Sequence, residues 1–444
     1  MKKKLLTLLL SLALVVTMMP MMALTSYATD PACKIGTTYY NTIQDAIDNA
    51  GPGETTIELT SDVTITQELV VYADKNILLN LAGKVITANG CRAIRNLGVL
   101  KIQDPGSNGK ICAGSADFGA ILKVESGSAT LQNGTLAGGN ATANGGGVCV
   151  DSGATFTLEN GTITGCAADG DGGGVFVATG GTFTIKGGLI SQNNAVNGAG
   201  VYANTGSKLS LNSARIKENV ATGDGGGLYL GSSLTSITGG DELNAIEENK
   251  ATNGGGIYYN NSYDDFTLTN WYLNSNVASN YGGGIYTTGN ALLILGKGSA
   301  VANNQALSGG GVFAPTGRPV VGCVITNNTC DGKYESNAFG FGGGAGIAGA
   351  QVVNCIVIGN AITNGANWSS SSNFGGAGLL GCPFVTNTVV AGNVSANNGG
   401  GAHNSTLVGC VISNNAAQCY GAGVCRSAVT DSKLVFNRTC SLKD

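Results

Sequence analysis

Glycine clusters return along this chain at a nearly constant interval, and this interval limits the available folds more than any other feature. The eleven clusters begin at Gly145, Gly172, Gly198, Gly225, Gly254, Gly282, Gly309, Gly342, Gly375, Gly399 and Gly421. Successive clusters begin 22 to 33 residues apart. This period is typical of a solenoid, in which each unit buries its apolar face by stacking on its neighbours.

Each unit between two clusters contains three short strand-like segments. In the unit that begins at Gly145, the segments Val148–Val150, Thr155–Leu158 and 161–164 alternate in polarity and are separated by turn residues. Each segment is too short for a helix and rich in β-branched residues. We therefore expect an all-β chain folded as a three-sheet parallel β-helix, with coils about 4.8 Å apart.

A second motif stands at the corner before the glycine cluster, where an aliphatic residue is followed three positions later by asparagine. The asparagine side chain both donates and accepts hydrogen bonds, so a column of them can bridge successive coils. We expect an internal asparagine ladder. The pairs are Ile190/Asn193, Ile216/Asn219, Ile246/Asn249, Leu273/Asn276, Ile325/Asn328, Val357/Asn360, Val390/Asn393 and Ile412/Asn415.

The chain divides into three parts. Residues 1–28 combine Lys2, Lys3 and Lys4 with an apolar run and small residues at the end, which is typical of a secretory signal peptide. Residues 29–125 are expected to form an N-terminal cap and the first, irregular coils. Residues 126–444 continue the same solenoid, and we expect this end to be truncated or uncapped, since the chain stops where another glycine turn is due.

Within the cap, residues 41–50 have the pattern of a short helix. Ile43, Ala46 and Ile47 lie on one helical face, Asn41 is the expected N-cap, and a Gly-Pro-Gly sequence follows. We expect this helix to cover the first coil, because an uncovered sheet end can recruit other chains.

The net charge argues against nucleic acid as a partner, and the hydropathy argues against a transmembrane segment in the mature chain. Removing the three lysines of the signal peptide takes the formal net charge from −4 to about −7, so nucleic acid is not expected as a partner. No second apolar stretch is long enough to cross a bilayer, so we expect no transmembrane segment in the mature chain. The protein is predicted to be exported, either extracellular or on the cell surface.

The glycine turn with its following aliphatic residue (Gly145 to Val148) and the aliphatic-x-x-Asn motif (Ile190 to Asn193) resemble repeats of the pectin-lyase-like superfamily. They are especially similar to the GGA(I/V) and FxxN repeats of chlamydial polymorphic outer-membrane proteins, although Phe is rare in the FxxN position here. The resemblance covers about residues 130–440 and implies a right-handed β-helix. Those outer-membrane proteins are autotransported adhesins, and the superfamily also contains polysaccharide hydrolases and lyases.

A row of aromatic residues is the candidate binding surface. These residues stand two positions after the last glycine of successive clusters, and the position before each one is aliphatic. Alternation sends the aliphatic side chains into the core and the rings outward, where they can stack on sugars or on a partner protein. In the competing interpretation the rings stack only on each other. The residues are Phe176, Tyr202, Tyr229, Tyr258, Tyr286 and Phe313.

Glu218 and Glu248 are the candidate catalytic pair of an alternative interpretation, a polysaccharide lyase or glycoside hydrolase that acts along the solenoid face. Each precedes the corner asparagine of adjacent coils, so their separation of about 5 Å would resemble that in retaining glycosidases and would raise one pKa. Nearby lysines favour an ordinary charged row instead. His403 is expected in a solvated loop with no catalytic role.

No metal or cofactor is expected. Asp171 and Asp224 flank glycine turns, but two coils separate them by about 9 to 10 Å, which is too far for one calcium ion. Both are interpreted as turn-forming residues.

The thirteen cysteines leave at least one without an intrachain partner. Cys323 and Cys355 occupy adjacent coils at a distance that permits a disulfide, whereas Cys410 is too far from them. Other pairings stay open: Cys419 with Cys425, and those among Cys33, Cys91 and Cys112.

Together these features predict an exported scaffold for adhesion, with an extracellular glycan or a host or other cell-surface protein as its partner. A binding protein is favoured over an enzyme, and a passive spacer is the third interpretation.

Overall fold

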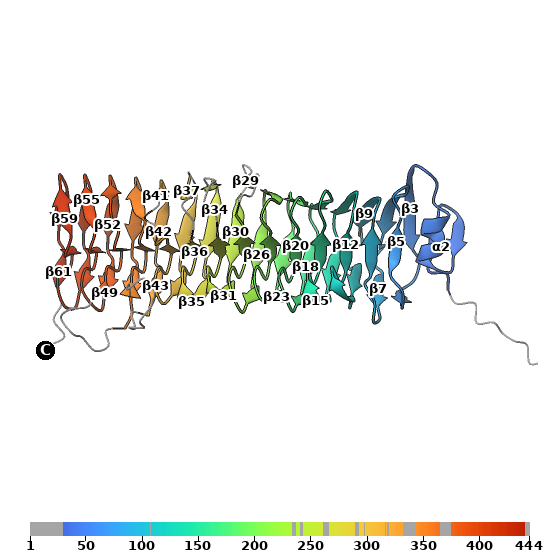
Figure 1. Ribbon diagram of the computed structural model, residues 1–444, viewed down its shortest axis with the longest axis horizontal. Helices are drawn as coiled ribbons and strands as arrows, with labels where there is room; N and C mark the ends of the chain where they lie inside the picture. Colours follow the sequence, from blue (N-terminus) through green and yellow to red (C-terminus); the bar gives the residue numbers. More distant parts are fainter. Residues whose placement is uncertain are drawn as a thin grey trace, which may run out of the picture.

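The computed structural model describes residues 30–106, 108–232, 237–239, 243–260, 266–288, 293–296, 298–315, 317, 319–331, 342–364 and 374–439. These residues form a long rod in which successive coils stack along one axis (Figure 1). The predicted signal peptide, residues 1–28, lies outside the described residues.

Each regular coil carries four strands. In the coil that begins at Gly145 they are β16 (Val148–Val150), β17 (Thr155–Leu158), β18 (Thr162–Thr164) and β19 (Ala167–Ala168). Equivalent strands pair in parallel and in register, so that Val175 faces Val201 and Val201 faces Leu228. The predicted parallel β-helix is confirmed. The fourth strand has two residues in this coil and up to five in others, as in β35 (Val277–Tyr281), and it adds a side to the coil that the sequence pattern did not indicate.

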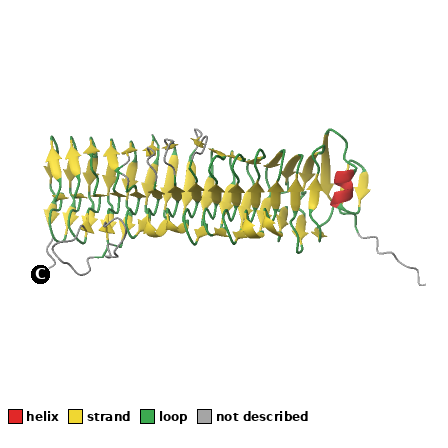
Figure 2. Cartoon of the chain, in the orientation of Figure 1, coloured by secondary structure: helices red, strands yellow, loops and turns green. Residues whose placement is uncertain are grey.

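Stacking of the coils produces long sheets whose strands follow one another along the rod (Figure 2). Three sheets contain 15, 14 and 13 strands, and a 10-stranded sheet is followed by a 7-stranded sheet on the remaining side. Because the register is maintained from coil to coil, residues in equivalent positions form straight files parallel to the rod axis.

Alternate residues of the strands fill the interior. Val175, Val201 and Leu228 are fully buried, and Phe156 stacks on Phe183 with ring centroids 5.4 Å apart. Burying one such side chain stabilises a protein by about 1.5 to 3 kcal/mol. The repeated apolar segments therefore provide the main driving force for stacking.

The predicted asparagine ladder is confirmed, and it runs along the corner between the 15-stranded and 13-stranded sheets. From Asn193 to Asn415, each Nδ2 donates to the Oδ1 of the asparagine in the next coil, over 2.9 to 3.0 Å, and to a backbone carbonyl of the preceding coil. Each Oδ1 also accepts a backbone N–H, so every interior amide has its donors and acceptors satisfied. The members are Asn193, Asn219, Asn249, Asn276, Asn304, Asn328, Asn360, Asn393, Asn415 and Asn437.

The glycine clusters allow the backbones of neighbouring coils to approach closely at the next corner. Gly172 has a φ of +70°, a conformation that glycine adopts without strain. A β-carbon on Gly174 would lie 2.6 Å from the carbonyl oxygen of Gly200 in the next coil. Any side chain at this position would therefore force the two coils apart.

The N-terminal end is covered by a helix, as predicted, and by an unpredicted hairpin. The helix is α2 (Ile43–Asp48), and the sequence analysis was wrong about its N-cap: the Thr42 hydroxyl, not Asn41, accepts the backbone N–H of Asp45 at 3.0 Å. The hairpin joins β1 (Cys33–Ile35) and β2 (Thr38–Tyr40), and β1 pairs antiparallel with β3 (Glu54–Leu59) of the first coil. It therefore extends the 10-stranded sheet beyond the first coil.

Candidate functional site

The predicted aromatic row lies on the outer side of the 14-stranded sheet, and we refer to it as the tyrosine file. Its members pair in register from coil to coil, and their strand neighbours Val175, Val201 and Leu228 point into the core, as the alternation predicted. The strands are β20 (Val175–Val177), β24 (Val201–Ala203), β28 (Leu228–Leu230), β32 (Ile257–Tyr259), β36 (Ile285–Thr287) and β40 (Val312–Phe313). Labels β20 and β36 mark this side of the rod in Figure 1.

The rings of the file stack on one another along the rod axis. The centroids of Phe176 and Tyr202 are 5.4 Å apart, those of Tyr202 and Tyr229 are 4.5 Å apart, and those of Tyr229 and Tyr258 are 4.9 Å apart. The planes of all three pairs lie within 12° of parallel. Each interior ring therefore has a neighbour on both faces, which leaves its edge and its hydroxyl group for other contacts.

The rings lie on the outer side of the sheet, as predicted, but most of them are not exposed to solvent, and they stack on each other as the competing interpretation held. Phe176, Tyr258 and Tyr286 are only 8%, 9% and 7% exposed, and Phe313 is fully buried. Tyr202 and Tyr229 are half-buried. Stacking removes the ring faces from solvent, and the tight glycine turn packs against the start of each side chain, since a β-carbon on Gly198 would lie 2.8 Å from Tyr202 Cβ.

Tyr281, which the sequence analysis did not single out, belongs to the same aromatic cluster. It lies 5.9 Å from the ring of Tyr286 and 4.6 Å from that of Phe313. Tyr281 stands directly before the glycine cluster, in the position that Asn253 and Asp224 hold in earlier coils. The aromatic residue in a position that is polar in those coils was the sequence signal that could have placed Tyr281 in the cluster.

Acidic and amide side chains form a second row at the turn beside the file. Asn197 Nδ2 donates to Asp171 Oδ1 at 2.9 Å, and Asn253 Nδ2 donates to Asp224 Oδ1 at 2.8 Å. Burial raises the pKa of Asp171 and of Asp224, while these amide hydrogen bonds act in the opposite direction. The predicted turn-forming role of both aspartates is consistent with these bonds within the row.

The tyrosine hydroxyls lie within electrostatic range of this row and of each other. Burial is the main cause that raises the pKa of Tyr202, Tyr229 and Tyr258, and the nearby carboxylates of Asp171 and Asp224 add to it. Burial raises the pKa of Tyr286 to about 12. The phenols therefore stay protonated at neutral pH and can both donate and accept hydrogen bonds.

A polar chain extends from the hydroxyls toward the adjoining loop. The Tyr202 and Tyr229 hydroxyls interact with each other, the Tyr229 hydroxyl with the side chain of Asn260, and the Tyr258 hydroxyl with that of Thr288. Thr288 Oγ1 in turn donates to Asn260 Oδ1 at 3.0 Å. The file thus presents a linked set of hydroxyl and amide groups above a stacked aromatic base.

Glu218 and Glu248 do not have the properties of an acid–nucleophile pair. Both stand in left-handed backbone conformation on adjacent coils, with φ of 56° and 58°. Glu218 forms an ion pair with Lys217 at 2.6 Å and accepts a hydrogen bond from Gln192 at 2.8 Å. These contacts lower the pKa of Glu218, which is the opposite of the raised pKa that a catalytic acid needs. The geometry favours a charged surface row.

His403 does not lie in a solvated loop, and this expectation is wrong. It is fully buried and continues the line of the tyrosine file, in register with Leu380 and Cys425. Neither ring nitrogen has a hydrogen-bond partner, and burial, with a smaller contribution from Arg426, lowers its pKa to about 4. The signal was present in the sequence, because His403 stands two positions after the last glycine of its cluster, as the tyrosines do.

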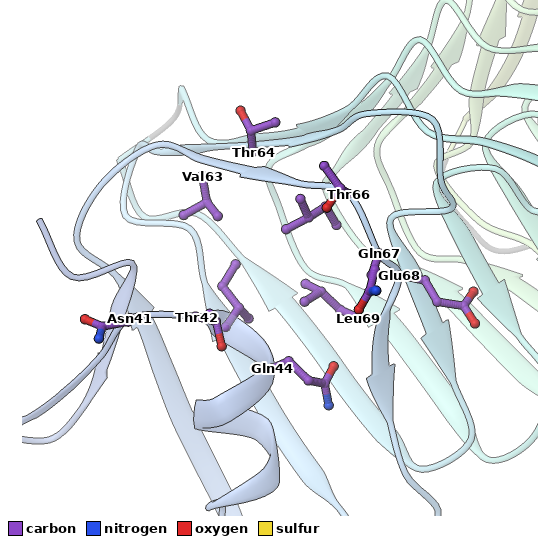
Figure 3. Close-up of a pocket in the computed structure, with 11 residues that line it drawn as sticks. Asn41, Thr42, Gln44, Val63, Thr64, Thr66, Gln67, Glu68 and Leu69 are labelled. Carbon is purple, nitrogen blue, oxygen red and sulfur yellow. The ribbon is translucent and has the colours of Figure 1, made fainter. Parts of the chain in front are cut away.

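A pocket of about 340 Å³ lies at the capped end of the rod, between the start of α2 and residues 63–69 (Figure 3). No sequence motif marked it. The Gln44 side chain donates a hydrogen bond to the carbonyl oxygen of Val70 at 3.2 Å and accepts one from the N–H of Val70 at 2.8 Å. Glu68 forms an ion pair with Arg92 at 2.6 Å. These polar groups are thus already engaged within the chain.

Comparison of the chain with protein-family models, curated proteins and solved structures finds no match. Within the described part of the chain, no three side chains of His, Cys, Asp or Glu are grouped in a way that could hold a metal ion. The helices of that same part include none with the length and hydropathy needed to cross a membrane.

Proposed function

We propose that this chain is an exported scaffold that binds an extracellular glycan or a cell-surface protein along the tyrosine file. The observation that carries the proposal is the half-buried pair Tyr202 and Tyr229, whose hydroxyls are linked to each other and to Asn260 on a rigid stacked base. The resemblance to pectin-lyase-like repeats, and to adhesins among them, supports a binding role. The signal-peptide pattern at the N-terminus supports export.

The geometry defines the mode of contact. Because neighbouring rings cover the faces of Tyr202 and Tyr229, a ligand meets ring edges and hydroxyls rather than a flat ring. Asp171 and Asp224 add acceptors alongside. Hydroxyl, amide and carboxylate groups that repeat at the coil spacing of about 4.8 Å suit a polyhydroxylated or extended ligand aligned with the rod.

Replacing both Tyr202 and Tyr229 by phenylalanine tests the proposal, because the change removes two hydroxyls and keeps the stacked rings. Loss of two hydrogen bonds, at about 1 kcal/mol each, is expected to weaken binding about thirtyfold on a glycan array or to intact cells. Tyr39→Phe, at an exposed tyrosine of the cap, is the matched control and should bind as wild type. Unchanged binding by the double variant would rule out the file as the binding surface.

A further inference from the structure

Two buried cysteines of adjacent coils lie in direct contact. Cys323 Sγ and Cys355 Sγ are 3.4 Å apart, and each residue is 2% exposed. They stand one position before the paired strands β42 (Val324–Thr326) and β47 (Ile356–Ile358), which run parallel and in register. Ile356 N–H also donates to the carbonyl oxygen of Cys323 at 2.9 Å, which fixes the two backbones side by side.

This placement meets the requirements of a covalent link. Neighbouring strands lie about 4.8 Å apart, within the range of roughly 4.4 to 6.8 Å that disulfide-bonded α-carbons span. The two sulfurs are already in contact at 3.4 Å, so only a short approach separates them from bonding distance. We propose that Cys323 and Cys355 form a disulfide that joins two adjacent coils.

The reaction is an exchange with a low-molecular-weight disulfide such as oxidised glutathione. One cysteine thiolate attacks the glutathione disulfide and releases one glutathione thiolate; the second cysteine thiolate attacks the mixed disulfide and releases the other. The two cysteines lose two electrons and two protons, and glutathione disulfide is reduced to two thiols. Since both sulfurs are buried in the folded rod, the first attack takes place during folding, while one sulfur is still accessible, and the second follows when stacking brings the two sulfurs together.

Cys410 is an internal control for this proposal. It occupies the same corner position two coils further on, and its Sγ lies 3.4 Å from the carbonyl oxygens of Val385 and Val408. Cys355 Sγ has the equivalent contacts with Val320 and Val353, at 3.4 and 3.3 Å. Both cysteines therefore share one environment, and only Cys355 has a cysteine in the neighbouring coil.

Serine is tolerated at this corner. Ser432 holds the equivalent position in the next coil, where its Oγ accepts the backbone N–H of Cys410 at 2.9 Å. Thr388 does the same for Cys355 at 3.3 Å. Cys323→Ser, Cys355→Ser and Cys410→Ser are therefore expected to fold.

The experiment refolds the full chain with oxidised and reduced glutathione, then denatures it in iodoacetamide without reductant and maps its peptides. We expect the peptides of Cys323 and Cys355 to be joined and lighter by two hydrogens, and Cys410 to be alkylated. Cys355→Ser should expose Cys323 to alkylation, whereas Cys410→Ser should leave the link intact. Alkylation of Cys323 and Cys355 to the same extent as Cys410 would overturn the proposal.

Thermal unfolding provides a second readout. Refolding with oxidised glutathione, compared with refolding in reductant, should raise the unfolding midpoint of the wild type and of Cys410→Ser, because the bond restricts the unfolded chain. The midpoint of Cys355→Ser should not differ between the two conditions. An equal shift in all three proteins would show that another cysteine pair is responsible.

Discussion

The position of a side chain in the coil decides its protonation, and His403 is the clearest case. Its ring lies where earlier coils carry tyrosine, yet neither nitrogen has a hydrogen-bond partner in this buried position. Burial favours the uncharged form of a base, and the positive charge of Arg426 acts in the same direction. The imidazole is therefore neutral at pH 7.

Stability is expected to fall in acid because of this residue. Its pKa is about 4 in the folded chain against an ordinary value of 6.5, so the unfolded chain binds the proton first. The contribution of neutral His403 to stability is fully present above pH 6.5. As the pH falls toward 4, the free energy of unfolding decreases by about 3 kcal/mol. Urea unfolding of wild type and His403→Phe at several pH values measures this loss.

The phenylalanine variant separates this effect from that of the aspartates. Because the pKa values of Asp171 and Asp224 are raised in the folded chain, their contribution to stability increases as the pH falls. This effect is opposite in sign to that of His403. The His403→Phe variant keeps both aspartates and therefore keeps their effect. Parallel pH profiles for the two proteins would contradict the assignment to His403.

The asparagine ladder is the element that aligns the coils at one corner. Asn249 accepts from Asn219 N–H and Nδ2, and its own Nδ2 donates to Asn276 and to the Ile216 carbonyl. Removing one member leaves several buried groups unsatisfied at once. Such groups cost about 1 to 3 kcal/mol each.

Asn249→Ala is therefore expected to lower the free energy of unfolding by about 3 kcal/mol or more, measured by urea denaturation. Asn140→Ala is the control, since Asn140 is an exposed asparagine at the start of β15 (Asn140–Asn144), and its effect should stay within about 0.5 kcal/mol. Equal effects of the two substitutions would show that the ladder adds no stability.

Strands and their register could be predicted from the sequence because one repeated pattern specifies both. The glycine spacing places Val175 opposite Val201, and alternation then assigns every neighbour to the core or to the surface. The fourth strand could not be predicted in most coils, because two residues such as Ala167–Ala168 are too few to show alternation. The N-cap was misassigned because Asn41 and Thr42 are adjacent and both can cap a helix.

The candidate site was only half predictable. The alternation of the sequence correctly predicted that the rings of the tyrosine file lie on the outer side of the 14-stranded sheet. It did not predict that most of these rings are buried there. Burial depends on ring stacking between coils and on Tyr281, which packs from the adjacent turn against Tyr286 and Phe313. These contacts join residues from different coils, and no pattern within a single coil reports them.

The close stacking of coils along the whole rod predicts a strong effect of small added volume. Gly174→Ala would bring a methyl group 2.6 Å from Gly200 O and 2.9 Å from Ile190 Cγ2. We expect a loss of about 1 to 3 kcal/mol in the free energy of unfolding, seen as a lower thermal midpoint. Gly51→Ala, where nothing lies within 4 Å of the added carbon, should leave the midpoint nearly unchanged.

The asparagine ladder also leaves the loops free to diverge. Consecutive members are separated by as few as 22 and as many as 33 residues, yet their amide contacts stay at 2.9 to 3.0 Å. The ladder fixes the position of one residue per coil and does not constrain the number of residues between consecutive ladder asparagines. The loops can therefore accept insertions, and whole coils can be duplicated or lost, while the stacked strands that carry these loops keep their arrangement.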